Sequence, residues 1–252
     1  MRFFTTTIFT LFFRLYSAFA QGDAALLSEN KVALKGSSDV PKEIAYPVSL
    51  YKEATIISQN LYNGRLYYVY DSRQDEHQFF GDRKWQKGVV FYDGQRFDSI
   101  PMIYDIVRDE LVIKHFNGDH LLLQSEKVDY FLKDNHTFQR MESGKDINPQ
   151  MRTGFYDVLY GGKTKALARR AKQRQEKIVE KRIISLFPEK DFYYIKKGDR
   201  YFSVRSKRSV LGLFPDKKKE LKKALRDEKI KFKKMRDVAI TKVVVTYDSL
   251  AK

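Results

Sequence analysis

The chain has 252 residues, of which 48 are Lys or Arg and 32 are Asp or Glu, so its formal charge is +16. Because it contains no cysteine, a disulfide framework and a cysteine-linked lipid anchor are both excluded. Aromatic residues make up 14% of the chain and provide large side chains for a core. The basic balance favours anionic partners such as lipid headgroups, acidic glycans or nucleic acid.

Residues 1–20 have the composition of a secretory signal peptide. Arg2 precedes the apolar run Phe3 to Phe13, and Ala18-Phe19-Ala20 offers a cleavage site. A membrane anchor needs roughly 20 apolar residues, and Arg14 interrupts this run much earlier. We therefore expect export, cleavage near Ala20 and a periplasmic or outer-membrane-associated protein. Removing this segment leaves 46 basic and 32 acidic residues, and export disfavours nucleic acid as the partner.

An N-terminal extension over 21–44 precedes a region, 45–205, whose pattern predicts an antiparallel β domain. Short runs of aromatic and β-branched residues alternate there with turn dipeptides that supply positive φ angles. The dipeptides are Asn63-Gly64, Asp93-Gly94, Asn117-Gly118, Gly161-Gly162 and Gly198-Asp199. Each predicts a two-residue hairpin turn, and together they predict about ten or more strands. We expect an α+β protein with a mainly antiparallel meander, either a curved sheet or a barrel-like sandwich, and a loop over 142–153.

Residues 163–182 carry nine basic side chains against Glu176 and Glu180. This pattern predicts a strand after the Gly161-Gly162 turn, followed by a solvated helix or a mobile insertion. Eight cations of the segment are our candidates for contacting an anionic partner, although a solvated face is the plainer interpretation. They are Lys165, Arg169, Arg170, Lys172, Arg174, Lys177, Lys181 and Arg182.

Residues 206–252 predict a basic helical C-terminal segment. A first helix is expected after the N-cap residue Asp216, and a second from about Lys234, although Val243 to Val245 would also suit a strand. The positions expected to face inward are Leu221, Ala224, Leu225, Val238, Ala239 and Tyr247.

The segment Gly162-Lys163-Thr164 matches the end of a phosphate-binding loop. That motif requires a glycine at position 157, where this chain has Asp157. Since a carboxylate would repel the approaching phosphate, the segment predicts a hairpin turn, and we expect no nucleotide and no other cofactor.

Two further groups of side chains are candidates for metal binding or catalysis. A two-residue turn at Asn117-Gly118 would place His115 opposite His120, close enough to share a metal ion if further ligands were present. An exposed polar pair is the plainer interpretation.

The carboxylates of Asp105, Asp109 and Glu110 could form the acid and base of a hydrolase. A polar connection between two strands explains them as well, so we assign no catalytic residue.

Three segments in order resemble a family of exported envelope proteins of Gram-negative bacteria that has no known activity. They are WQKGVVFYDGQRFDSIPMIYDIVRDELVI, GFYDVLYGGKTKALARR and YYIKKGDRYFSVRSKRSVLGLFPDKKKELKKALRDEKIKFKKMRDVAITKVVVTYDSL. The resemblance covers nearly all of the chain after residue 20. It implies an envelope protein and carries over no catalytic residues.

Together these observations favour a non-enzymatic interaction or structural component of the cell envelope. The alternative is a periplasmic lipid or glycan binder that uses a basic face. A hydrolase acting on envelope polymers is the third possibility.

Overall fold

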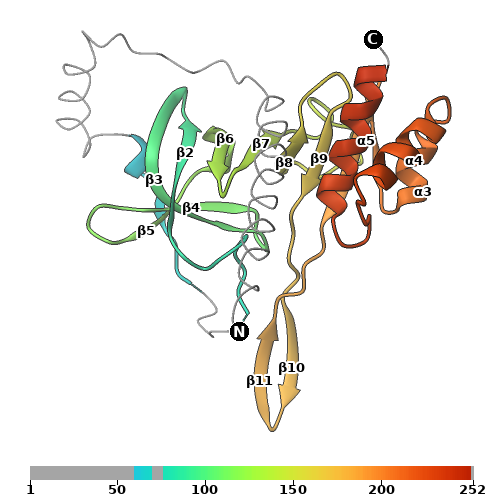
Figure 1. Cartoon of the computed structure of the whole chain (residues 1–252). Coiled ribbons are helices and arrows are strands. Elements are labelled where there is room, and N and C mark those ends of the chain that lie inside the picture. The colour runs from blue at the N-terminus through green and yellow to red at the C-terminus, as the bar shows by residue number, and fades with distance from the viewer. Residues whose placement is uncertain (1–59, 70–75, 251–252) are drawn as a thin grey trace, which may run out of the picture.

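The computed structural model describes residues 60–69 and 76–250, so the predictions for 1–20 and 21–44 lie outside the described residues. Its main feature is an antiparallel sheet of eleven strands in the order β1-β5-β4-β3-β2-β6-β7-β8-β9-β12-β13 (Figure 1). The strands are β1 (Arg65–Leu66), β2 (Gln86–Tyr92), β3 (Gln95–Asp105), β4 (Glu110–Lys114), β5 (His120–Leu122), β6 (Val128–Lys133), β7 (His136–Met141), β8 (Gly154–Tyr160), β9 (Ala166–Arg169), β12 (Phe192–Lys197) and β13 (Arg200–Val204). The predicted antiparallel meander is confirmed, and it forms a curved, open sheet whose edges are β1 and β13.

Two of the predicted hairpin turns have the expected two-residue form. Asp93 and Gly94 join β2 to β3 with φ angles of 52° and 78°, and Tyr92 pairs with Gln95 across them. Gly198 has a φ of 61° in the turn between β12 and β13. Another two-residue turn, Asp134-Asn135, joins β6 to β7 without glycine, because short polar side chains tolerate positive φ.

The other three turn dipeptides behave differently. Asn117-Gly118 and Gly161-Gly162 do lie in hairpin connections, but these connections are longer than two residues. The hairpin predicted at Asn63-Gly64 is wrong. The amide of Asn63 donates to the carbonyl of Asn60 at 3.2 Å and closes the 3-10 helix η2 (Asn60–Tyr62), which is fixed by the buried side chain of Leu61.

One row of directly paired residues crosses eight strands on a single face of the sheet. The row is Phe97, Val90, Phe131, Phe138, Asp157, Ala168, Tyr193 and Val204. All eight are buried, and only Asp157 is charged. The row's first four residues belong to one hydrophobic core and its last three to a second. Asp157 therefore lies at the boundary between the two cores.

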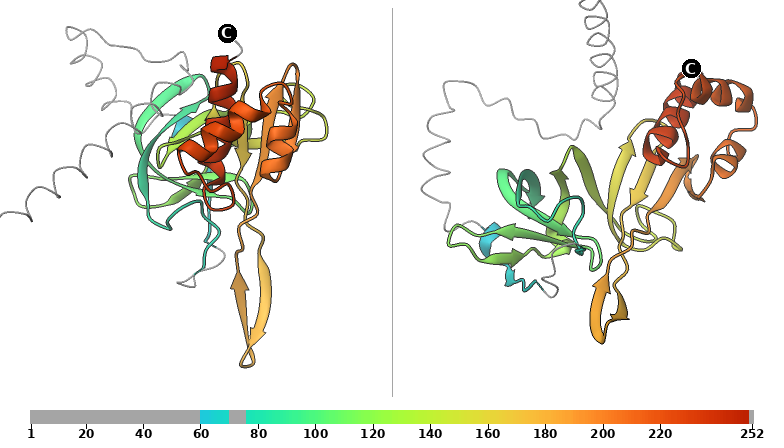
Figure 2. Two further views of the ribbon diagram at one scale, coloured as in Figure 1. Left: turned by 45° about the vertical axis from the view of Figure 1, so that its right-hand side comes forward. Right: turned by 60° about the horizontal axis from the view of Figure 1, so that its bottom comes forward.

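The second core lies under three helices, α3 (Lys207–Gly212), α4 (Lys218–Asp227) and α5 (Arg236–Leu250). These helices form a layer beside β8 and β9 (Figure 2). The opposite face of this part of the sheet is covered by the predicted loop over 142–153, which inserts Ile147 and Met151. Among the described residues, no helix is both long enough and apolar enough to cross a bilayer.

The predicted C-terminal helices are confirmed, with corrections in detail. Leu221, Leu225 and Ala239 are buried, and Ala224 and Tyr247 are half-buried. Val238 was expected to face inward but is 38% exposed, because Ile240 and Val243 occupy the buried face of α5. The N-cap of α4 is Lys217 and not Asp216, and Val243 to Val245 lie within α5.

Of the two alternatives predicted after the strand within 163–182, a helix or a mobile insertion, the helix is wrong. After β9, the chain forms a hairpin of β10 (Gln175–Val179) and β11 (Arg182–Leu186), which projects from the body of the molecule (Figure 1). Its turn, Glu180-Lys181, has φ angles of 50° and 62°. Paired β-branched residues such as Ile178 and Ile183 favour strands over helix. We call residues 174–186 the arm.

Candidate functional site

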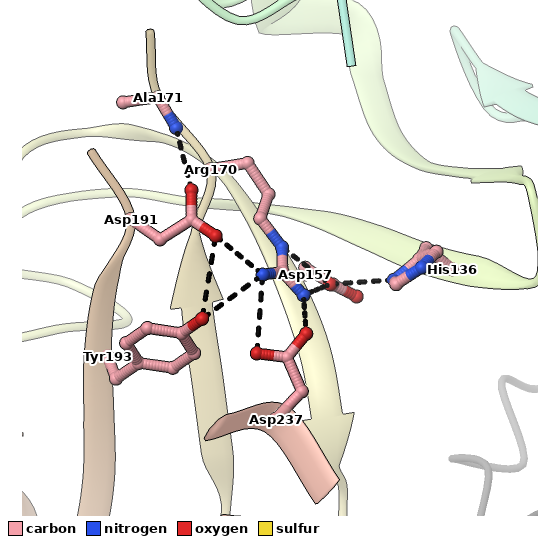
Figure 3. Close-up of polar contacts among 7 residues, drawn as sticks. All are labelled: His136, Asp157, Arg170, Ala171, Asp191, Tyr193 and Asp237. Carbon is pink, nitrogen blue, oxygen red and sulfur yellow. Dashed lines mark hydrogen bonds and ion pairs between the residues drawn. The ribbon is translucent and has the colours of Figure 1, made fainter. Parts of the chain in front are cut away.

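The charge of Asp157 is balanced by Arg170, a buried residue that comes directly after β9 in the chain. The Nε and Nη2 atoms of Arg170 donate to Oδ2 of Asp157 at 3.0 and 2.6 Å (Figure 3). A buried carboxylate is costly unless it is paired and hydrogen-bonded. Arg170 therefore makes a charged residue tolerable in the apolar row.

Arg170 also holds two carboxylates from other segments. Its Nη1 donates to Oδ2 of Asp191, just before β12, at 2.7 Å, and its Nη2 donates to Oδ2 of Asp237, in the first turn of α5, at 2.6 Å (Figure 3). We call Asp157, Arg170, Asp191 and Asp237 the Arg170 cluster. It connects β8, the end of β9, the start of β12 and the helical layer.

Burial works against the charged form of Arg170, but the three carboxylates outweigh it and raise the pKa of the guanidinium. Burial also opposes the charge of Asp237, yet the hydrogen bond from Arg170 holds the pKa of this carboxyl below its ordinary value. Burial, together with the neighbouring Asp237, raises the pKa of the Tyr193 hydroxyl. The cluster therefore keeps its central cation and the Asp237 anion at neutral pH.

Two neighbouring residues add contacts to the carboxylates of the cluster. Nδ1 of His136 lies 2.8 Å from Oδ2 of Asp157, and the Ala171 amide donates to Oδ1 of Asp191 at 3.4 Å (Figure 3). An open pocket of about 590 Å³ adjoins the cluster, between Asp191, Tyr193 and the segment 233–238. Since its carboxylates are already bound to Arg170, the arrangement is suited to fastening α5 to the sheet.

The acidic residues considered for hydrolysis serve the connection between β3 and β4. Oδ1 of Asp105 accepts the amides of Val107 and Arg108 at 2.9 and 3.0 Å. Asp109 accepts from the Tyr104 hydroxyl and lies 3.9 Å from Nη2 of Arg169. Glu110 pairs in register with Asp105, and burial raises its pKa. The expected polar connection thus accounts for Asp105 and Asp109.

The predicted opposition of His115 and His120 is wrong. His120 pairs with Lys114, and the amide of His115 donates to the carbonyl of Asp119 at 2.8 Å. The connection is therefore longer by one residue, and the two rings have different neighbours: His120 lies against Trp85, and His115 against Tyr62. In the described part of the chain, no group of three or more His, Asp or Glu residues is arranged to hold a metal ion.

The Gly161-Gly162 segment lies in the loop between β8 and β9. A Cβ atom at Gly162 would overlap the ring of Tyr160, so close packing requires glycine here. The amide of Thr164 donates to Oδ2 of Asp248 in α5 at 2.9 Å. The loop that resembles a phosphate site therefore binds a carboxylate of its own chain.

The eight predicted cations divide into an inner and an outer group. Arg169 and Arg170 lie beside aspartates, and Nζ of Lys172 donates to the carbonyls of His77 and Phe79, both at 2.9 Å. Lys165 is half-buried in the β8–β9 loop. Four lie on the exposed arm: Arg174, Lys177, Lys181 and Arg182.

Asp191, Asp237 and Tyr193 were not predicted from the sequence as partners of Arg170, and neither was His136 as a partner of Asp157. They lie between 21 and 67 residues from their contacts along the chain. Only the position of Asp237 in the first turn of a helix gives a local signal, because acidic residues are favoured there.

No family model matches the chain, and comparison with curated proteins and with solved structures also found no match.

Replacing Arg170 by Met should lower the free energy of unfolding by about 3–5 kcal/mol, because the buried carboxylate of Asp157 loses its main partner. The matched control is Lys177→Met on the exposed arm, which we expect to change stability by less than about 0.5 kcal/mol. Urea unfolding followed by circular dichroism measures both values. Equal stabilities for the two variants would contradict a stabilising role for Arg170.

Proposed function

We propose that this protein is an exported, non-enzymatic interaction component of the cell envelope that contacts a partner protein through its arm. The observation that carries this proposal is the exposure of large apolar side chains on the projecting hairpin. Ile178 is 74% exposed and Ile183 is 56% exposed. Exposed apolar side chains grouped on one protruding element are typical of a contact surface.

Strand pairing within the arm brings the exposed isoleucines together. Ile178 and Ile183 are directly opposed, so their side chains lie on one face near the tip. The next pair, Val179 and Arg182, lies on the other face and adds a third exposed aliphatic side chain. The tip therefore offers an apolar contact on both sides of a thin ribbon.

Cations surround this apolar tip. Lys177, Lys181 and Arg182 are exposed, against the two acids Glu176 and Glu180. The partner that fits is an apolar depression with an acidic rim: the isoleucines would supply affinity and the cations would supply association rate and orientation. The cations of the arm are half of those predicted from the sequence to contact an anionic partner, and this proposal retains that role for them.

The base of the arm holds it in a defined direction. The pairing of β9 with β12 continues through the Lys190 amide, which donates to the carbonyl of Ala171 at 2.8 Å, and the Gln173 amide, which donates to the carbonyl of Pro188 at 3.2 Å. Phe187 is buried where the arm meets the body. A preorganised contact element loses less conformational entropy on binding.

A photo-reactive amino acid at Ile178 should cross-link in cells to one discrete protein, because this side chain would be buried against the partner. The matched control position is Phe116, which is 57% exposed on the connection between β4 and β5. Adding Ile183→Ser to the Ile178 probe should reduce the adduct at least fivefold. The proposal would be contradicted by the same adducts from both positions, or by adducts with lipid alone.

Export predicts that the mature protein begins at Gln21, because Ala18-Phe19-Ala20 is the expected cleavage site. N-terminal sequencing of protein purified from cells checks this. An Ala18→Lys variant should retain residues 1–20, since a large charged residue blocks a small-x-small site. An intact Met1 on the wild-type protein would rule out cleavage and with it the expected route to the envelope.

A further inference from the structure

A basic groove lies on the helical layer, away from the arm. It has a volume of about 850 Å³, and seven of its nine lining residues are Lys or Arg. The other two are Leu225 and Ile230, so the groove has an apolar floor and no acidic lining residue. Figures 1 and 2 show the helical layer and the arm at different ends of the molecule.

The spacing along α4 gathers four of these cations. Lys219, Lys222, Lys223 and Arg226 follow the i, i+3, i+4, i+7 pattern that places side chains on one helix face. This basic face adjoins the buried face that contains Leu221 and Leu225. The aliphatic stems of the lysines extend the apolar floor while their ammonium groups reach solvent.

The chain reversal after α4 brings further cations to the same groove. Lys229 has a φ of 54°, a left-handed conformation for which glycine is preferred at a helix C-terminus. The following amide, that of Ile230, donates to the carbonyl of Leu225 at 2.9 Å and closes the turn. Lys229 thus occupies a position that favours glycine, and it supplies a cation to the groove together with Lys231.

The charges of the groove are little compensated within the described residues. Arg226 lies 3.9 Å from Asp227, with both side chains largely exposed, and such pairs are weak. Glu228, at the end of α4, forms its ion pair with Lys242 of α5, outside the groove. Gathered like charges repel one another and favour binding of a multivalent anion.

We infer that this groove binds the phosphate headgroup of an anionic phospholipid, with the half-buried Ile230 and the aliphatic stems of the surrounding lysines contacting the start of an acyl chain. Lysine ammonium groups are effective point-charge ligands for phosphate, and clustered lysines attract anionic membrane surfaces. The apolar floor favours an amphiphile over a free phosphate or a fully polar glycan. Because this site is separate from the arm, it does not depend on the arm's proposed partner.

The test is sedimentation of the purified protein with vesicles of phosphatidylglycerol and phosphatidylcholine, compared with pure phosphatidylcholine. A groove variant carries Lys222→Gln, Lys223→Gln and Arg226→Gln. The matched control variant carries Lys177→Gln, Lys181→Gln and Arg182→Gln on the arm, which removes the same charge. We expect anionic vesicles to bind the wild type, the groove variant to lose at least tenfold in affinity, and the arm variant to change less than threefold.

Two further measurements make the test decisive. The groove variant should melt at or above the wild-type temperature, because removing like charges relieves repulsion, so its lost binding would not reflect unfolding. Calorimetric titration should show at least tenfold tighter binding of dihexanoyl phosphatidic acid than of inorganic pyrophosphate. Equal binding of these two ligands, equal losses in the two variants, or no wild-type binding to anionic vesicles would each overturn the inference.

Discussion

The guanidinium of Arg170 is the contact on which the arrangement of this protein depends. It neutralises Asp157 in an otherwise apolar row and holds Asp191 and Asp237 from segments far apart in the chain. The helical layer carries the basic groove, and the arm begins a few residues after Arg170. A single buried cation therefore connects the sheet to the helical layer and lies close in the chain to the start of the arm.

Local signals in the sequence predicted much of the fold. The dipeptide Asp93-Gly94 and the run of β-formers around it determine a hairpin through φ angles and side-chain alternation, and Leu221 and Leu225 mark a helix by their spacing. The register at Asn117-Gly118 was not predictable in this way, because two-residue and longer turns accept the same dipeptide. The arm escaped prediction because its turn, Glu180-Lys181, lacks glycine and its strands carry many charges.

The candidate sites show more clearly that local signals in the sequence do not determine tertiary contacts. Arg170 and Lys177 belong to one basic run, yet one is buried against three aspartates and the other is exposed on the arm. Only contacts with Asp157, Asp191 and Asp237 distinguish them, and those residues are distant in the sequence. The basic groove is partly predictable, because the helical spacing of Lys219 to Arg226 can be read from the sequence. The approach of Lys207 and Lys231 to this groove depends on tertiary packing and cannot.

The Arg170 cluster fastens the helical layer to the sheet, because one guanidinium binds Asp157 of β8 and Asp237 of α5. Native-state hydrogen exchange of wild type and Arg170→Met measures this most directly, because it reports the stability of each segment separately. Amides of α5 and β12 should lose protection in the variant, while those of β2, β3 and β4 should remain close to wild type. Unchanged protection in α5, or an equal loss across all these strands, would contradict this role of the cluster.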